Sequence, residues 1–188
     1  MPKIAKTLSI VLLFALATAA MAAESPHVVP VTIDPDVVYG HKMGMALTFD
    51  VLSPVEPNGA AVLFMVSGGW FSQWSPPGQL AGRFDDLLEN GFTVFAVRHG
   101  SSPLFKVPDA VDDVRRAVRF IKANASEWDV DPARLGVFGG SAGGHLSLML
   151  GTTGDDGDVA ATDPVLRGSS RVAAVVAYFP PVDLTGFT

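Results

Sequence analysis

The chain has 188 residues, 48% of them hydrophobic, and a formal net charge of −6 at pH 7. An acidic chain is repelled by phosphate backbones, so the charge argues against a nucleic-acid partner. Zero cysteines exclude disulfides, cysteine nucleophiles and thiolate metal sites.

The first 23 residues have the pattern of an export signal. Lys3 and Lys6 precede an apolar run over residues 8–17, and small residues follow at positions 20–23. The run is too short to span a bilayer comfortably, so we expect no membrane anchor. We expect residues 1–23 to be removed during export to the periplasm or the medium.

The remaining residues, 24–188, suffice for one hydrophobic core and are expected to form a single domain. Strand-like runs alternate with helix-like patterns, which indicates an α/β fold with a mostly parallel sheet and flanking helices. Short β-prone pieces occur over residues 28–33 and 37–39, a strand is expected over residues 45–51, and the sheet is expected to start with a β-hairpin. Further strands are expected over residues 60–66, 92–97, 135–138 and 172–179, and helices over residues 79–90, 108–125 and around 146–150.

The most informative stretch is Gly139-Gly140-Ser141-Ala142-Gly143, which fits the Gly-x-Ser-x-Gly pattern of a nucleophilic serine. We expect Ser141 on a sharp strand-to-helix turn. Gly139 and Gly143 remove the side chains that would collide where the strand meets the helix. The Ala142 amide would then face the carbonyl oxygen of a substrate attacked by Ser141.

Two other interpretations of this glycine-rich turn are a phosphate cradle and an ordinary tight connection. A phosphate-binding loop would carry a lysine after its glycines, and this segment does not. The expected strand before the turn and helix after it favour the nucleophile.

A second pair of glycines, Gly68 and Gly69, follows the strand expected over residues 60–66. Glycines let backbone amides approach a ligand closely, so these two amides are expected to complete an oxyanion hole with Ala142. An isolated Gly-Gly would be only a loop, and the prediction depends on its combination with Ser141.

Three aromatic residues, Trp70, Phe71 and Trp74, follow these glycines. They suggest an aromatic rim that suits a sugar or an aryl ester, with Trp70 as a substrate-binding residue. The expected partner is a small-molecule or polysaccharide-linked ester, and no cofactor is expected.

The segment over residues 151–170 is rich in Gly, Asp, Thr and Ser and is expected to be a mobile loop. Asp155, Asp156 and Asp158 lack the ligand spacing and distal glutamate of a calcium loop, so no metal is expected there.

With these motifs assembled, the sequence resembles an α/β-hydrolase of the esterase/lipase kind, close to the secreted acetyl-esterase and feruloyl-esterase-like branch. The resemblance covers about residues 40–188 and rests on the motifs at 67–70, 117–121, 131–134 and 139–146. It implies that Ser141 is the nucleophile and that the Gly69 and Ala142 amides, with Gly68, form the oxyanion hole. Ser67 stands where such proteins usually carry the histidine of His-Gly-Gly-x-Trp.

The rest of the catalytic triad is missing. In this family an acid and then a histidine follow the nucleophile, whereas here only His145 follows Ser141. His145 lies four residues on along the same helix and is expected to pack rather than act as the base. Asp183 follows its strand too early to be the acid, and His99, on a loop after a strand, is expected to be structural.

The absent base and the apolar strand expected over residues 172–179, which would form an uncovered sheet edge, suggest a C-terminally truncated copy of a longer enzyme. The leading hypothesis is a serine hydrolase that cleaves carboxylic esters through an acyl-enzyme on Ser141. One alternative is a catalytically inactive remnant or binding module. A second is a serine peptidase of the prolyl-oligopeptidase kind, although the chain is short and has no propeller domain.

Overall fold

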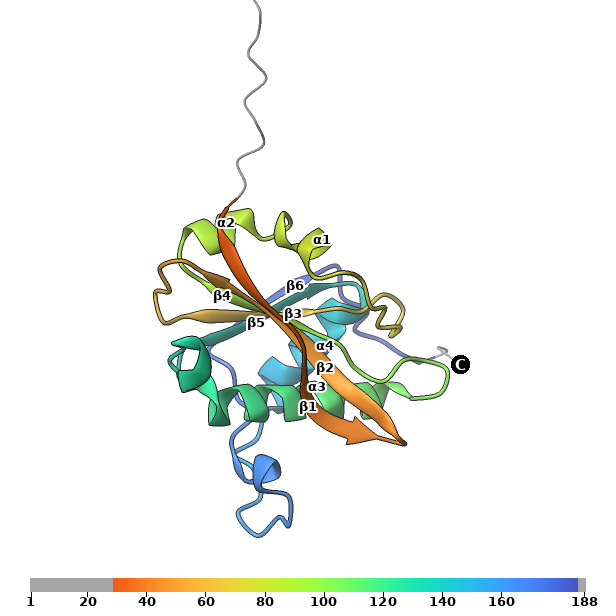
Figure 1. The fold of residues 1–188 in the computed structure, drawn as a ribbon. Coiled ribbons are helices and arrows are strands. Elements are labelled where there is room, and N and C mark those ends of the chain that lie inside the picture. The colour runs from red at the N-terminus through yellow and green to blue at the C-terminus, as the bar shows by residue number, and fades with distance from the viewer. Residues whose placement is uncertain (1–28, 186–188) are drawn as a thin grey trace, which may run out of the picture.

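A computed structural model describes residues 29–185 and centres on one six-stranded mixed sheet (Figure 1). The strands are β1 (Val31–Lys42), β2 (Met45–Pro54), β3 (Ala61–Met65), β4 (Thr93–Val97), β5 (Leu135–Gly140) and β6 (Ala174–Tyr178). The helices are α1 (Gly78–Ala81), α2 (Asp85–Glu89), α3 (Val107–Ala123) and α4 (Ala142–Thr153), with 3₁₀ turns η1 (Ala125–Trp128) and η2 (Pro164–Arg167). The expected export signal lies outside the described residues.

The sheet has the order β1-β2-β4-β3-β5-β6, which confirms the α/β class. β1 and β2 form the expected antiparallel hairpin, and β2 also runs antiparallel to β4. The pairs β3–β4, β3–β5 and β5–β6 are parallel. Because parallel strands end at the same edge of a sheet, the loops after β3, β4 and β5 meet there, and such edges are where open α/β sheets bind ligands.

Helices cover both faces of the sheet. α3 and α4 pack on one face, and α1 and α2 lie on the other (Figure 1). α3 carries an apolar stripe that is buried, at 4% exposure or less for Val111, Val114, Val118 and Ile121. Each such side chain contributes roughly 1.5–3 kcal/mol when removed from water, so this stripe fixes α3 on the sheet.

The helix expected over residues 79–90 is two short helices, α1 and α2. The chain turns over residues 82–84, and Phe84 is buried against Phe64 and Phe138. Gly91 follows with a φ of +78°, as expected of a glycine that ends a helix. The apolar pattern was therefore correct, but the break between the helices was missed.

The segment expected as a mobile loop over residues 151–170 begins with the last turn of α4 and contains η2. Its acidic side chains are bound by arginines of α3, in the ion pairs Arg116–Asp163 and Arg119–Asp155. The loop therefore has fixed anchor points on α3.

β6 occupies one edge of the sheet. Within the described part of the chain it pairs with β5 alone, and Val176 and Tyr178 are 48% and 56% exposed. Its residues alternate between exposed and half-buried, in agreement with the uncovered edge expected from the sequence. No described helix is both long and apolar enough to span a membrane.

Candidate active site

Ser141 stands between the end of β5 and the start of α4, on the strand-to-helix turn that its motif predicts. Its backbone has φ 53° and ψ −122°, a strained conformation for a residue with a side chain. The Ser141 amide donates to the Tyr178 carbonyl of β6 at 2.9 Å, and the Ser141 carbonyl accepts from the His145 amide at 2.9 Å. The Ser141 residue is exposed, at the positive N-terminal end of α4.

Two glycines make this turn possible. A Cβ on Gly139 would lie 2.5 Å from the carbonyl carbon of Gly143, and one on Gly143 would lie 2.8 Å from the Met65 carbonyl oxygen. Both distances are too short for any side chain, so strand and helix meet here only because both residues are glycine.

The turn after β3 offers candidate oxyanion donors, as the sequence suggested. Gly69 has a φ of +57°. The Gly68 amide is unavailable for this role, because it donates to the Phe71 carbonyl at 3.0 Å and the Phe71 amide donates back to Gly68 at 2.9 Å. The Gly69 and Ala142 amides therefore remain as the predicted donors.

A pocket of about 470 Å³ opens beside Ser141. Ser67 from the turn after β3 and Phe179 from the end of β6 both line it, which shows that these loops converge on the serine. Its other walls combine polar and apolar side chains, from Phe64, Met65, Val66, Gln73, Ser75, Leu80 and Arg83.

Trp70 is buried, at 7% exposure, with a φ of +58°. Its indole Nε1 lies 3.4 Å from His145 Nδ1, and the two rings meet edge to face at 5.5 Å. It lines a pocket of about 640 Å³ next to Gly69. The exposed aromatic rim is formed instead by Phe71 and Trp74, each 54% exposed, and the substrate-binding role of Trp70 stays a prediction.

His145 is placed as a packing residue. An indole N–H can only donate, so Nδ1 of His145 accepts and the ring proton resides on Nε2. Burial lowers the pKa of His145, which favours this neutral form.

Asp183 hydrogen-bonds a neighbouring residue. Its carboxylate accepts from the amide and the hydroxyl of Thr185. The hydroxyl contact holds the pKa of Asp183 below its usual value.

The structure also pairs two residues that sequence reasoning left apart. Nε2 of His99, from the loop after β4, lies 2.9 Å from the Ser67 Oγ, in the turn after β3. His99 is 5% exposed, and its Nδ1 contacts the Gly100 carbonyl at 2.8 Å. The only sequence signal was that each residue follows a buried strand.

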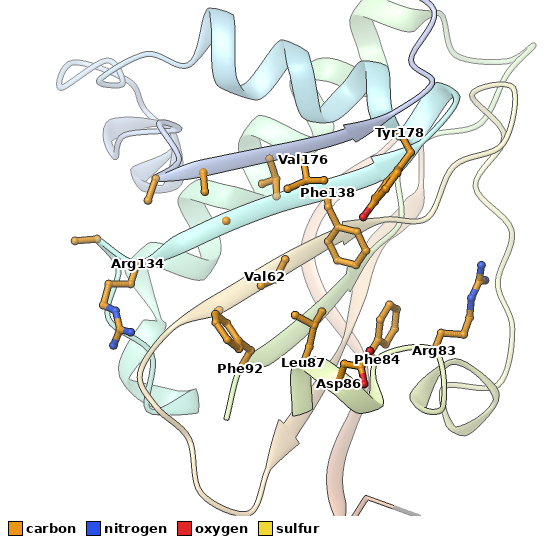
Figure 2. A pocket seen from close by; sticks show the side chains of 16 residues that line it. Val62, Arg83, Phe84, Asp86, Leu87, Phe92, Arg134, Phe138, Val176 and Tyr178 are labelled. Atoms are coloured by element: carbon orange, nitrogen blue, oxygen red, sulfur yellow. The ribbon is translucent and has the colours of Figure 1, made fainter. Parts of the chain in front are cut away.

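An apolar pocket of about 620 Å³ lies over β3 and β5 on the same face of the sheet as α2 (Figure 2). Val62, Phe138 and Leu87 point into it, and Tyr178 closes one end (Figure 2). Ser141 does not line it, so we do not assign chemistry to it. Among residues 29–185, no group of three or more His, Asp or Glu side chains is placed to hold a metal.

The family described as BD-FAE matches residues 49–188. The probable carboxylic ester hydrolase LipM of Mycobacterium tuberculosis is 33% identical over 155 residues, which are 81% of this chain and 35% of that protein. An acetylxylan esterase of Xylanibacter ruminicola is 32% identical over 103 residues, 53% of this chain and 20% of that protein.

Solved structures agree with this match. A truncated carbohydrate esterase from gut microbiota is 28% identical with a TM-score of 0.71, and the alignment covers 85% of this chain and 60% of that one. Thermogutta terrifontis esterase 2 phosphorylated by paraoxon is 25% identical with a TM-score of 0.64, over 82% and 59%. The described residues therefore have the α/β-hydrolase fold, and the chain spans about a third of LipM's length.

Proposed function

Because this chain belongs to the BD-FAE family, we propose that it acts on carboxylic esters with Ser141 as the nucleophile. The observation that carries the proposal is the strained, exposed Ser141 at the N-terminus of α4, beside the Gly69 turn. Similarity to LipM and to an esterase that paraoxon phosphorylates supports it.

In the proposed reaction, the Ser141 Oγ attacks the ester carbonyl carbon. The carbonyl oxygen becomes an oxyanion that the Gly69 and Ala142 amides stabilise. Collapse of this intermediate releases the alcohol, which takes up a proton, and leaves an acyl group on Ser141. Water then attacks the acyl carbon and frees the carboxylic acid and the Ser141 hydroxyl.

This sequence of steps needs a base to accept the Ser141 proton. None of the three histidine side chains in the described residues hydrogen-bonds Ser141: the His145 ring contacts Trp70, the His99 ring contacts Ser67, and His41 lies on the β1–β2 hairpin. Loss of a triad base lowers turnover about a million-fold in a well-studied serine protease. We therefore expect this chain to react with an activated phosphonate far more readily than it turns over an ester.

We propose a small-molecule or polysaccharide-linked ester as the substrate. The acetylxylan esterase and a Butyrivibrio fibrisolvens xylanase among the relatives support a plant-polysaccharide ester. Gln73 and Ser75 in the pocket beside Ser141 could hydrogen-bond sugar hydroxyls. Export is proposed from the signal-like residues 1–23.

Labelling by a fluorophosphonate probe tests the nucleophile. We expect one label on each chain, lost in Ser141→Ala and kept in Ser126→Ala, which changes an exposed serine of η1. Equal labelling of the Ser141→Ala chain would refute the proposal.

A second candidate is a non-catalytic binding module, favoured by the lack of any hydrogen bond from a histidine side chain to Ser141 within the described residues. A complete failure of the wild-type chain to label would support this candidate. Family membership favours ester cleavage over the peptidase alternative.

A further inference from the structure

Two loops at the catalytic edge of the sheet are joined by hydrogen bonds. The first, residues 66–72, follows β3 and contains the Gly69 turn; the second, residues 98–102, follows β4. Within the first loop, Ser72 Oγ donates to the Val66 carbonyl at 2.6 Å. Three of the bonds join the two loops. The Ser72 amide donates to Ser101 Oγ at 2.9 Å, the His99 amide donates to Ser72 Oγ at 3.3 Å, and the Ser102 amide donates to the Trp70 carbonyl at 2.9 Å.

His99 contacts the residue at which the chain enters the oxyanion turn. Its Nε2 meets the hydroxyl of Ser67, the residue immediately before Gly68, at 2.9 Å. The turn that follows is tight, because Gly68 and Phe71 bond each other in both directions and Gly69 and Trp70 both have positive φ. Such a turn moves as one unit, so the position of Ser67 determines where the Gly69 amide points.

The proton positions in this pair follow from the ring contacts. A carbonyl oxygen can only accept, so the Nδ1 that lies 2.8 Å from the Gly100 carbonyl carries the ring proton. Burial lowers the pKa of His99, against opposing influences from the Gly100 carbonyl and Asp113, and Lys42 lowers it further. The ring is therefore neutral near pH 7, and Ser67 donates its hydroxyl proton to Nε2.

We propose that His99 is a positioning residue for the ester-hydrolase reaction proposed above: it fixes the Ser67 hydroxyl and thereby orients the Gly69 amide toward the oxyanion formed at Ser141. The Ser102–Trp70 bond fixes the exit of the same turn, so the turn is held at both ends. A displacement of about 1 Å at such a donor lowers the rate of reaction by up to about a hundredfold.

The competing interpretation is a buried histidine that only stabilises the fold. Substitution by an amide residue tests the two ring contacts one at a time. The side-chain amide of asparagine takes the position of Nδ1, and that of glutamine takes the position of Nε2. His99→Asn keeps a donor for the Gly100 carbonyl and loses Ser67, whereas His99→Gln keeps an acceptor for Ser67.

The test measures the rate constant for Ser141 phosphonylation by a fluorophosphonate at saturating probe, in folded protein. We expect His99→Asn and Ser67→Ala each to lower this rate constant about tenfold, and the double variant to be no slower than the slower single variant. His99→Gln should stay within about threefold of wild type. Unchanged rates in His99→Asn, or effects that multiply in the double variant, would overturn the proposal.

The pair also has a readout that needs no reactivity. In ¹⁵N spectra we expect His99 Nε2 at the position of an unprotonated acceptor, and Ser67→Ala should shift both this resonance and the Gly69 amide. An unshifted Gly69 amide would refute the positioning role even if the wild-type chain fails to label. Failure to label together with a shifted Gly69 amide would refute the proposed function and leave the positioning role standing.

Discussion

Trp70 donates its indole N–H to Nδ1 of His145 at 3.4 Å, so a residue of the turn after β3 is bonded to the first turn of α4, the helix that follows Ser141. Both side chains are buried, at 7% and 8% exposure. This contact links the predicted oxyanion turn to α4 and occupies the histidine nitrogen that could otherwise accept a proton.

His145→Ala should therefore affect stability more than chemistry. We expect a loss of about 1–3 kcal/mol in the free energy of unfolding, because a buried partner of Trp70 is removed and a cavity is left. Urea denaturation measures this loss. Ser141 phosphonylation in the folded variant should stay within about tenfold of wild type, whereas loss of a general base would lower it by orders of magnitude.

Gly143→Ala should prevent the strand-to-helix turn from forming. Its Cβ would lie 2.8 Å from the Met65 carbonyl oxygen, a backbone atom that cannot move aside. We expect a loss of about 3 kcal/mol or more in the free energy of unfolding, together with loss of Ser141 labelling. Gly78→Ala is the matched control, since a Cβ there meets nothing within 4 Å. It should leave labelling intact, and equal effects of both changes would contradict the prediction.

Asp50→Asn should destabilise the sheet where β2 meets β4. The Asp50 carboxylate is fully buried and binds Arg98 through two hydrogen bonds, of 2.6 and 2.8 Å. Within the described part of the chain, the change leaves the buried Arg98 paired only with Asp36, which is 49% exposed, so we expect a loss of about 3 kcal/mol in thermal or urea unfolding. Asp112→Asn breaks the exposed pair with Arg115 and should change stability by less than about 1 kcal/mol.

Stability should fall as the pH drops through the ordinary histidine pKa of 6.5. Burial lowers the pKa of both His99 and His145 in the folded chain, so the unfolded chain takes up protons first. The free energy of unfolding is therefore higher at about pH 7.5 than at about pH 5.0. The aspartates with lowered pKa, such as Asp155, add a further loss only at more acidic pH.

Urea denaturation of the double variant His99→Gln/His145→Gln checks this assignment. The variant should show a flatter dependence of unfolding free energy on pH over the same interval, because two titrating groups are removed. An unchanged slope would assign the dependence to other groups.

Much of the fold was readable because its signals are local. The apolar runs located β2 to β6 within a few residues, whereas β1 was expected only as short β-prone pieces. The turn at Ser141 was readable because Gly139 and Gly143 are the residues that its crowded backbone requires. The break between α1 and α2 was missed, since it depends on how Phe84 packs against aromatic rings from β3 and β5.

Contacts between distant segments were not readable from sequence. Ser67 and His99 are 32 residues apart, and they meet only because β3 and β4 are parallel neighbours in the sheet. Likewise, nothing in residues 151–170 indicated that Asp155 and Asp163 would be bound by arginines of α3. The Gly68 amide was misassigned because its bond to Phe71 depends on the conformation of the turn.

The hydrogen bond from the Ser141 amide to the Tyr178 carbonyl constrains the order in which these segments can fold during synthesis. A ribosome makes the serine before it makes the strand whose carbonyl holds that serine's amide. While the chain emerges, β5 and α4 can form, but the Ser141 amide has no Tyr178 carbonyl to bond until β6 docks on β5. The turn at Ser141 therefore reaches its final form only after β6 has been made, later than the Gly69 turn that is predicted to receive the substrate's oxygen.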